Sequence, residues 1–391
     1  MGHMPIAVPA VATPTRHIQG LDGLRAVAAT AVVAYHVQFL VESGQDPLSS
    51  AGAAGWVGVD LFFAISGFIL FLPFARAARD GRTVDVRRFL GRRARRILPA
   101  YWFNLFVLVT LAAPAMLTTG RGLVTVLADA TFTADYLGMA SVNSVYWSLY
   151  CEVAFYLALP LMARAFVGRR WVVGLPAAMA VGWAYRYLMV TSVEAESYFR
   201  LIMQFPGVID QFAFGMTAGA VWALVEDGRK RVPRWLTAAL VVAGTLIAAG
   251  TVWTIQRRIG LAHYWSGDTR WGDAMLVTLR PCLSLGFALV IFGVCFQPNG
   301  LRRVLELRPV RYVGLVSYGL YLWHLPVIRA LADVVDVPGR SSLIYLSATA
   351  GVFMLSLAWA AASYHLIEVR YLRLRVDAQP PVRPAQALRA S

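Results

Sequence analysis

The chain has 391 residues, of which 58% are hydrophobic and 15% are charged, and its mean hydropathy is +0.59. Soluble globular proteins are about half apolar and about a quarter charged, so this composition excludes most soluble folds and predicts an integral membrane protein. The formal net charge of +15 rests almost wholly on arginine. Such residues mark the cytoplasmic loops of membrane proteins, so we expect a lipid bilayer as partner and no nucleic acid.

The chain outside the membrane segments is short. Residues 1–20 lack a basic start followed by an apolar run, which predicts a cytoplasmic N-terminal segment without a cleavable signal peptide. Residues 372–391 are rich in proline and lack apolar periodicity, so we expect a disordered cytoplasmic tail. A single transmembrane domain over 21–371 remains. The three cysteines lie in apolar stretches without paired spacing, which favours core residues over a disulfide or a metal site.

Apolar segments long enough to cross a bilayer recur along the whole chain. A helix needs about 20 apolar residues to span a hydrocarbon core of about 30 Å. The predicted spans are 22–41, 56–75, 97–117, 146–165, 171–190, 201–225, 235–255, 274–296, 312–331 and 342–363. The shorter stretch 122–137 contains two aspartates, so we expect a re-entrant or interfacial segment there. The predicted fold class is an all-α polytopic membrane protein, with about ten transmembrane helices in one bundle.

The distribution of arginine predicts the orientation of this bundle. Nine arginines occur between residues 76 and 96, whereas the segment 42–55 contains none. The same alternation continues along the chain, so we expect both termini to be cytoplasmic. Arginine outnumbers lysine 35 to one, which is typical of a GC-rich bacterial genome. We therefore expect a multi-pass protein of the bacterial plasma membrane.

The first predicted span contains two basic residues on one helix face. Arg25 and His36 are eleven residues apart, which is almost three helical turns. Asp60 enters the second span at about the depth that His36 reaches, so we expect it to pair with this imidazole. A carboxylate on one ring nitrogen would make the other a general base. The alternative is that His36 is a hydrogen-bonded structural residue.

Three further spans carry polar residues at a similar depth. Glu152 is the only acidic residue of its span, and Tyr321 and His324 lie on one face of the ninth span together with Ser317. Ionisable groups are costly inside a bilayer, so their occurrence indicates a functional site. Ser66 lies six residues beyond Asp60 and is either a nucleophile or a small packing residue.

The arginines before the third span have two interpretations. They can be a topology signal, or Arg92 and Arg96 can bind a phosphate-bearing ligand at the mouth of a polar cavity through bidentate pairing. Arg186, Arg280 and Arg329 are expected to form ion pairs or to reach an interface. Asp210 stays open.

Motifs for nucleotide hydrolysis, redox chemistry and metal hydrolysis are absent from the sequence, so we expect no metal.

The chain resembles acyltransferase family 3, a family of integral membrane proteins. Five motifs carry this resemblance over about residues 21–371. They are Arg25 followed after ten residues by His36, GVDLFFAISGF at 58–68, RRARRILPAYW at 92–102, WSLYCE at 147–152 and SYGLYLWHLP at 317–326. The resemblance implies transfer of an acyl group, usually acetyl, from acyl-CoA to a hydroxyl group.

The resemblance also implies residue roles. It assigns the essential histidine to His36 and the paired basic residue to Arg25. Catalytic roles are expected for His36, Asp60 and Glu152. Binding of the acyl-CoA co-substrate is expected for Arg25, Arg92, Arg93, Arg96 and Tyr101. Substrate binding is expected for Ser66, Trp147, Tyr150, Tyr321, His324 and Asp210.

The acceptor is not apparent from these motifs. Larger members of the family append an extracytoplasmic domain. We expect no such domain here, which favours a small acceptor or a lipid-linked sugar, and the acceptor we expect first is a sugar-containing or macrolide-type secondary metabolite. The alternative acceptor is a cell-envelope polysaccharide or a lipid-linked glycan. A proton-coupled transporter or flippase and a non-catalytic membrane protein are the alternatives of other classes.

Overall fold

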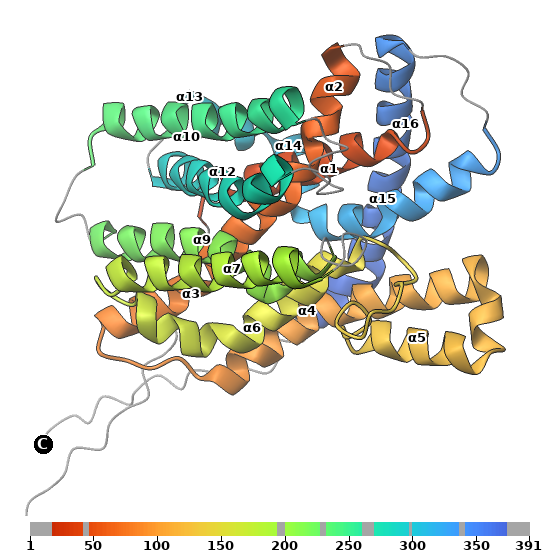
Figure 1. The fold of residues 1–391 in the computed structure, drawn as a ribbon, viewed down its shortest axis with the longest axis horizontal. Coiled ribbons are helices and arrows are strands. Elements are labelled where there is room, and N and C mark those ends of the chain that lie inside the picture. The colour runs from red at the N-terminus through yellow and green to blue at the C-terminus, as the bar shows by residue number, and fades with distance from the viewer. Residues whose placement is uncertain are drawn as a thin grey trace, which may run out of the picture.

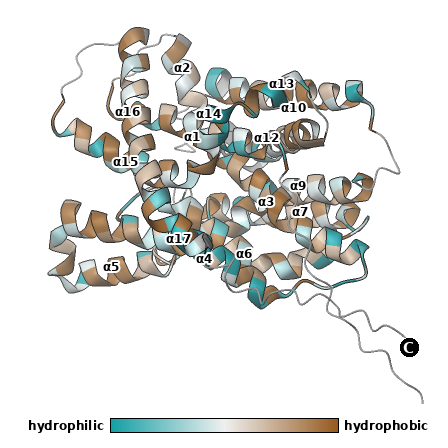
Figure 2. Cartoon of the chain, turned by 180° about the vertical axis from the view of Figure 1, so that it is seen from behind, coloured by the Kyte–Doolittle hydropathy of each residue, from teal (hydrophilic) through white to brown (hydrophobic). Residues whose placement is uncertain are grey.

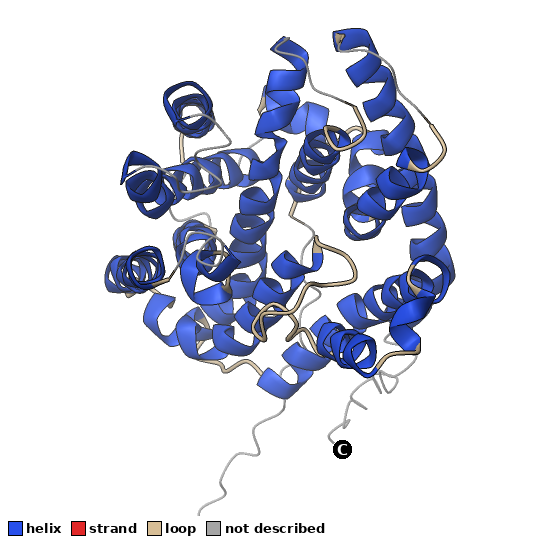
Figure 3. Cartoon of the chain, turned by 45° about the vertical axis from the view of Figure 1, so that its right-hand side comes forward, coloured by secondary structure: helices blue, strands red, loops and turns tan. Residues whose placement is uncertain are grey.

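The computed structural model describes residues 18–41, 47–193, 200–226, 232–259, 270–296, 299–335 and 341–373, and within these ranges the chain is helical without strands (Figure 3). The helices are α1 (Leu21–Val37), α2 (Pro47–Ala53), α3 (Val57–Arg79), α4 (Val86–Val107), α5 (Gly120–Ala130), α6 (Tyr146–Phe166), α7 (Trp171–Ser192), α9 (Phe205–Val225), α10 (Arg234–Thr254), α12 (Arg270–Phe296), α13 (Gly300–Leu305), α14 (Arg308–Leu315), α15 (Ser317–Ala332), α16 (Ser342–Ser363) and α17 (Val369–Arg373). Helices α7, α9, α10 and α12 lie roughly parallel, and α5 extends from the opposite side of the molecule (Figure 1).

Six helical segments in the described part of the chain are long and apolar enough to span a membrane. They are Leu48–Arg79, Tyr146–Phe166, Arg200–Val225, Arg234–Arg257, Thr278–Phe296 and Ser342–Tyr371. Helices α1 and α15, which fall in two of the predicted spans, have 17 and 16 residues and are shorter than a straight crossing requires. The all-helical membrane class is confirmed, whereas the count of ten spans and the cytoplasmic termini stay predictions.

Hydropathy varies along the outer surface of the bundle. Apolar segments dominate α5 and α16, and hydrophilic residues gather near α4 and α17 (Figure 2). On α16, Leu343 and Met354 are 75% and 62% exposed. Exposure of large apolar side chains at this level is what a lipid-facing helix requires.

Glycines allow α3 and α9 to approach each other closely at the centre of the bundle. A Cβ atom on Gly67 would meet the carbonyl oxygen of Phe212, and one on Gly215 would meet that of Ala64. Small residues permit such backbone contact between membrane helices. The α3 face that carries Ser66 is therefore held at a fixed rotation.

Replacement of Gly67 by alanine should destabilise the protein by about 1–3 kcal/mol, because the added methyl group meets backbone that cannot move aside. The measurement is the thermal unfolding temperature of the detergent-solubilised chain. Gly351→Ala is the matched control, since nothing lies within 4 Å of a Cβ at that position. Equal unfolding temperatures for the two variants would contradict the close helix contact.

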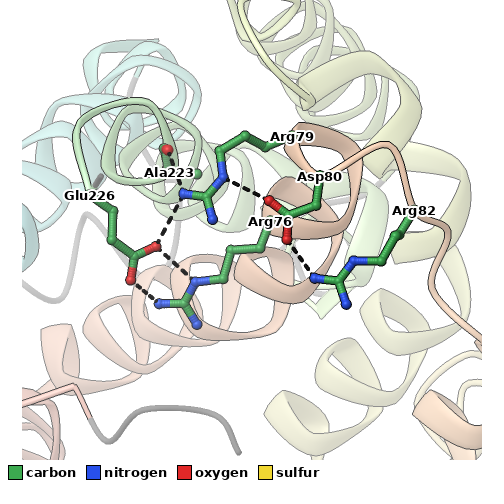
Figure 4. Close-up of polar contacts among 6 residues, drawn as sticks. All are labelled: Arg76, Arg79, Asp80, Arg82, Ala223 and Glu226. Carbon is green, nitrogen blue, oxygen red and sulfur yellow. Dashed lines mark hydrogen bonds and ion pairs between the residues drawn. The ribbon is translucent and has the colours of Figure 1, made fainter. Parts of the chain in front are cut away.

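A charged network joins the C-terminal ends of α3 and α9 (Figure 4). The Arg76 Nε and Nη2 atoms donate to the two carboxylate oxygens of Glu226 at 2.9 and 2.6 Å. Arg79 approaches the same carboxylate at 3.8 Å and donates to Asp80 at 3.1 Å. Hydrogen bonds from Arg82 and Arg79 lower the pKa of Asp80 below its usual value. The network fixes the end of α3 just before the arginine-rich segment that begins α4.

Glu226→Gln should lower the unfolding temperature at neutral pH, and this loss should disappear in acid. Burial raises the pKa of Glu226, but the hydrogen bonds from Arg76 outweigh it, and the pKa in the folded protein is lower than the usual 4.5. The stabilisation, at most about 1 kcal/mol for a pair this exposed, is present above pH 4.5 and is lost as the pH falls through the lowered pKa. Unfolding temperatures of both chains across this range test the prediction, and a constant gap would contradict it.

Candidate active site

Five helices, α1, α3, α4, α6 and α15, contribute side chains to a pocket that encloses about 740 Å³ of space, including the part open to solvent. Its α3 wall follows one helix face, because Val59, Phe62, Ser66 and Ile69 recur at intervals of three or four residues. Apart from Ser66 this wall is apolar, and the charged groups of the pocket come from the other helices.

One part of the pocket is cationic. Arg25 of α1 and Arg93 and Arg96 of α4 line it, and Glu152 is its only acidic lining residue within the described chain. The two α4 arginines are three residues apart and so share a helix face. The Nε atom of Arg93 is buried and has no hydrogen-bond partner among the described residues. Guanidinium groups in this arrangement are suited to an anion such as a phosphate.

Glu152 is held by two hydroxyl groups. The Oγ of Ser66 and the phenol of Tyr156 both donate to its Oε1, at 3.0 and 2.6 Å. Tyr156 and Ser148, which also line the pocket, are missing from the predicted set. Both lie four residues from Glu152 on α6 and therefore on the same helix face. This spacing is the sequence signal that could have identified them. The contact with Glu152 shows that Ser66 does more than pack beside Gly67.

His36 pairs with a second histidine and not with Asp60. Its Nδ1 lies 2.9 Å from the carbonyl oxygen of Val32 and 3.1 Å from the Nε2 of His324. The Nδ1 of His324 lies 2.7 Å from the carbonyl oxygen of Tyr321. The predicted His36–Asp60 pair is therefore wrong for this structure.

The rotation of α3 explains this correction. Gly58 faces α1, because a Cβ there would meet the carbonyl oxygen of Ala28. Asp60 lies two residues on, about 200° further round the helix, and so points away from α1. Its Oδ1 instead accepts from Arg280 of α12 at 3.4 Å, and both side chains are buried. Matching depth alone did not determine which neighbouring helix Asp60 meets.

His36 adjoins the pocket without lining it. Tyr321 lines the pocket, and its ring centroid is 5.7 Å from that of His324 and 6.1 Å from that of Phe62. The hydroxyl of Tyr321 donates to the carbonyl oxygen of Val145 at 3.1 Å, which fixes the ring. Tyr321 thus lies between the pocket and the histidine pair.

The predicted residues separate into two groups. Those that line the pocket are Arg25, Ser66, Arg93, Arg96, Glu152 and Tyr321. Those that do not are His36, Asp60, Arg92, Tyr101, Trp147, Tyr150, Asp210 and His324.

Two of the tyrosines outside the pocket hold the chain between α5 and α6. Tyr150 donates to Asp129 Oδ1 at 2.6 Å, and Tyr101 donates to the carbonyl oxygen of Asp129 at 2.8 Å. The other carboxylate oxygen of Asp129 accepts from the backbone N–H of Val142 at 2.8 Å. This geometry supports a structural role for both tyrosines, and it leaves their predicted binding roles without a contact to the pocket.

The remaining predicted residues face other neighbours. Trp147 packs edge-on against Phe63, with ring centroids 6.1 Å apart. Asp210 accepts from Nη1 and Nη2 of Arg186 at 3.2 and 2.8 Å, and both side chains are fully buried. The ion pair expected for Arg186 is confirmed, and its partner is the aspartate that had been left open. Within the described residues no group of three or more His, Cys, Asp or Glu side chains could hold a metal ion.

Sequence comparison assigns this helical bundle to a family. The family model described as "Acyltransferase domain" matches residues 18–365, which is most of the chain. The chain belongs to acyltransferase family 3. No solved structure matches it.

Curated relatives of this chain include bacterial proteins named as O-acetyltransferases. The peptidoglycan O-acetyltransferase OatA of Listeria monocytogenes is 26% identical over 82% of this chain and 51% of its own length. The O-acetyltransferase OatA of Staphylococcus aureus is 24% identical over 80% of the chain and 51% of its own length. The chain therefore spans about half the length of these relatives.

Proposed function

We propose that this family 3 member is a membrane O-acetyltransferase that moves an acetyl group from acyl-CoA to a hydroxyl group of a cell-envelope glycan. The observation that carries the proposal is the pocket in which Arg25, Arg93 and Arg96 meet the hydrogen-bonded Glu152, close to the His36–His324 pair. The name of the Listeria relative, a peptidoglycan O-acetyltransferase, supports a glycan acceptor. The names of the relatives give no support to a macrolide acceptor, so a cell-envelope glycan, the alternative acceptor from the sequence analysis, replaces it in this proposal. A plasma-membrane location is part of this proposal.

Charge and shape give each part of the pocket a task. The arginines bind the phosphates of acyl-CoA, and the apolar α3 wall takes the pantetheine arm and the acyl group. Arg25 either holds a phosphate or stabilises the oxyanion. Glu152 fixes Ser66 and Tyr156 and limits the positive charge of the pocket.

The reaction itself requires a base. His36 takes the proton of the acceptor hydroxyl while the oxygen attacks the thioester carbonyl. The C–O bond forms, the C–S bond breaks, and the CoA thiolate leaves and takes up the proton. A hydroxyl group is a weak nucleophile at neutral pH, so loss of this base slows the reaction strongly.

The donor half of the proposal is tested by comparing acetyl-CoA with S-acetyl-pantetheine, which lacks the nucleotide phosphates. Arg93→Gln and Arg96→Gln should each raise the KM for acetyl-CoA about tenfold or more, since a charge-assisted hydrogen bond contributes about 1.5–3 kcal/mol. The KM for S-acetyl-pantetheine should not change. The matched control is Arg87→Gln, at an exposed arginine of α4 outside the pocket. Equal effects on both donors would contradict phosphate binding by these arginines.

A further inference from the structure

Two histidines from helices far apart in the sequence form a hydrogen-bonded pair beside the pocket. His36 is near the end of α1 and His324 is in the middle of α15. Their ring centroids are 4.8 Å apart, and the Nδ1 of His36 is 3.1 Å from the Nε2 of His324. His324 is fully buried.

Neighbouring carbonyl groups assign the protons of this pair. A carbonyl oxygen only accepts, so the Nδ1 of His324 beside Tyr321 O and the Nδ1 of His36 beside Val32 O both carry hydrogen. When both rings are neutral, the Nε2 of His324 carries no hydrogen and is an acceptor. The Nδ1–H of His36 then donates to two acceptors, this nitrogen and the carbonyl oxygen of Val32. The Nε2 of His36 keeps its lone pair, as a general base requires.

The two carboxylates that could have supported His36 are bound elsewhere. Asp60 forms an ion pair with Arg280, and Glu152 accepts from Ser66 and Tyr156. In the part of the chain that the structure describes, neither is hydrogen-bonded to the histidine pair.

We infer that His324 is a positioning residue that replaces the carboxylate of a Ser-His-Asp arrangement: its Nε2 accepts from His36 Nδ1–H, orients the ring and stabilises the imidazolium formed during transfer. The inference deepens the proposed function and rests on it. When the acceptor hydroxyl gives its proton to His36 Nε2, the Nδ1–H bond to His324 strengthens, because a charged donor makes a stronger hydrogen bond. The neutral imidazole of His324, as a hydrogen-bond acceptor, can orient and stabilise His36 without placing a second charge in the membrane.

The kinetic test uses the purified chain with acetyl-CoA and a soluble disaccharide of N-acetylglucosamine and N-acetylmuramic acid. His324→Leu should lower kcat about 100-fold, the loss typical of a misplaced catalytic group, and leave the KM for acetyl-CoA unchanged. His324→Gln should recover most of the rate, because its amide oxygen can accept from His36 and its amide nitrogen can donate to Tyr321 O. Trp323→Phe is the matched control, since its buried indole nitrogen has no hydrogen-bond partner among the described residues.

A spectroscopic test separates this inference from the proposed function. In protein labelled with ¹⁵N-histidine, a ¹⁵N–¹⁵N coupling across the hydrogen bond should connect His36 and His324 and be lost in His324→Leu, whether or not the chain is active. Absence of the coupling overturns the inference, and so does wild-type kcat in His324→Leu. Absence of acetyl transfer by a wild-type chain that shows the coupling overturns the proposed function, and with it the positioning role of His324 in this reaction.

Discussion

His36→Ala is expected to reduce the rate of acetyl transfer by about 10²- to 10⁴-fold, the usual contribution of a general base. The KM for acetyl-CoA should stay close to the wild-type value, because His36 does not line the arginine-containing pocket. The measurement is the steady-state rate with acetyl-CoA and the peptidoglycan disaccharide. A reduction of kcat without a change in KM would mean that an interaction made only in the transition state had been removed.

The matched control for this variant is His365→Ala. His365 is exposed, and its Nε2 lies 3.2 Å from the hydroxyl of Tyr312, away from the pocket. Loss of this histidine should leave kcat within about twofold of the wild-type value, since surface substitutions usually change little. An active His36→Ala protein, or equal losses in both variants, would contradict the role of His36 as the base.

Asp210→Ala should destabilise the chain by about 3–5 kcal/mol, because it leaves Arg186 charged and fully buried without this partner. The Arg186→Met/Asp210→Leu double variant should regain most of that stability, since apolar residues of similar volume often replace a buried ion pair without loss. The free energy of unfolding in detergent, compared among the three chains, is the measurement.

The same comparison decides between two roles for Asp210. A structural ion pair predicts the destabilisation and its recovery in the double variant. A substrate-binding residue, as expected from sequence, predicts instead a stable Asp210→Ala protein with a raised KM for the acceptor. The hydrogen bonds from both Nη atoms of Arg186 favour the structural role.

Helical periodicity and depth predicted much of the candidate site. The spacing of Arg25 and His36, the depth of Glu152 and the grouping of Tyr321 with His324 all follow from residues within single helices, and the structure places these side chains in or beside one pocket. Such properties depend on 3.6 residues per turn and 1.5 Å per residue, which require no knowledge of neighbouring helices.

Partners across helices could not be predicted in the same way. The direction of Asp60 depends on the rotation of α3, and this rotation depends on Gly58 and Gly67 contacting the backbones of α1 and α9. The roles of Tyr101 and Tyr150 depend on Asp129, which lies in a segment interpreted only as re-entrant or interfacial. Tertiary packing determines these pairings, and the sequence pattern of a single helix cannot predict how that helix packs against its neighbours.

The most direct test of the central claim is transfer of isotope-labelled acetyl from acetyl-CoA to the peptidoglycan disaccharide by the purified chain in lipid nanodiscs, followed by mass spectrometry. The account predicts a disaccharide carrying one labelled O-acetyl group with the wild-type chain, and a yield at least 100-fold lower with His36→Ala. An unlabelled disaccharide with the wild-type chain, or undiminished labelling with His36→Ala, would contradict it. Movement of unmodified disaccharide across sealed vesicles without labelling would instead favour the transporter alternative.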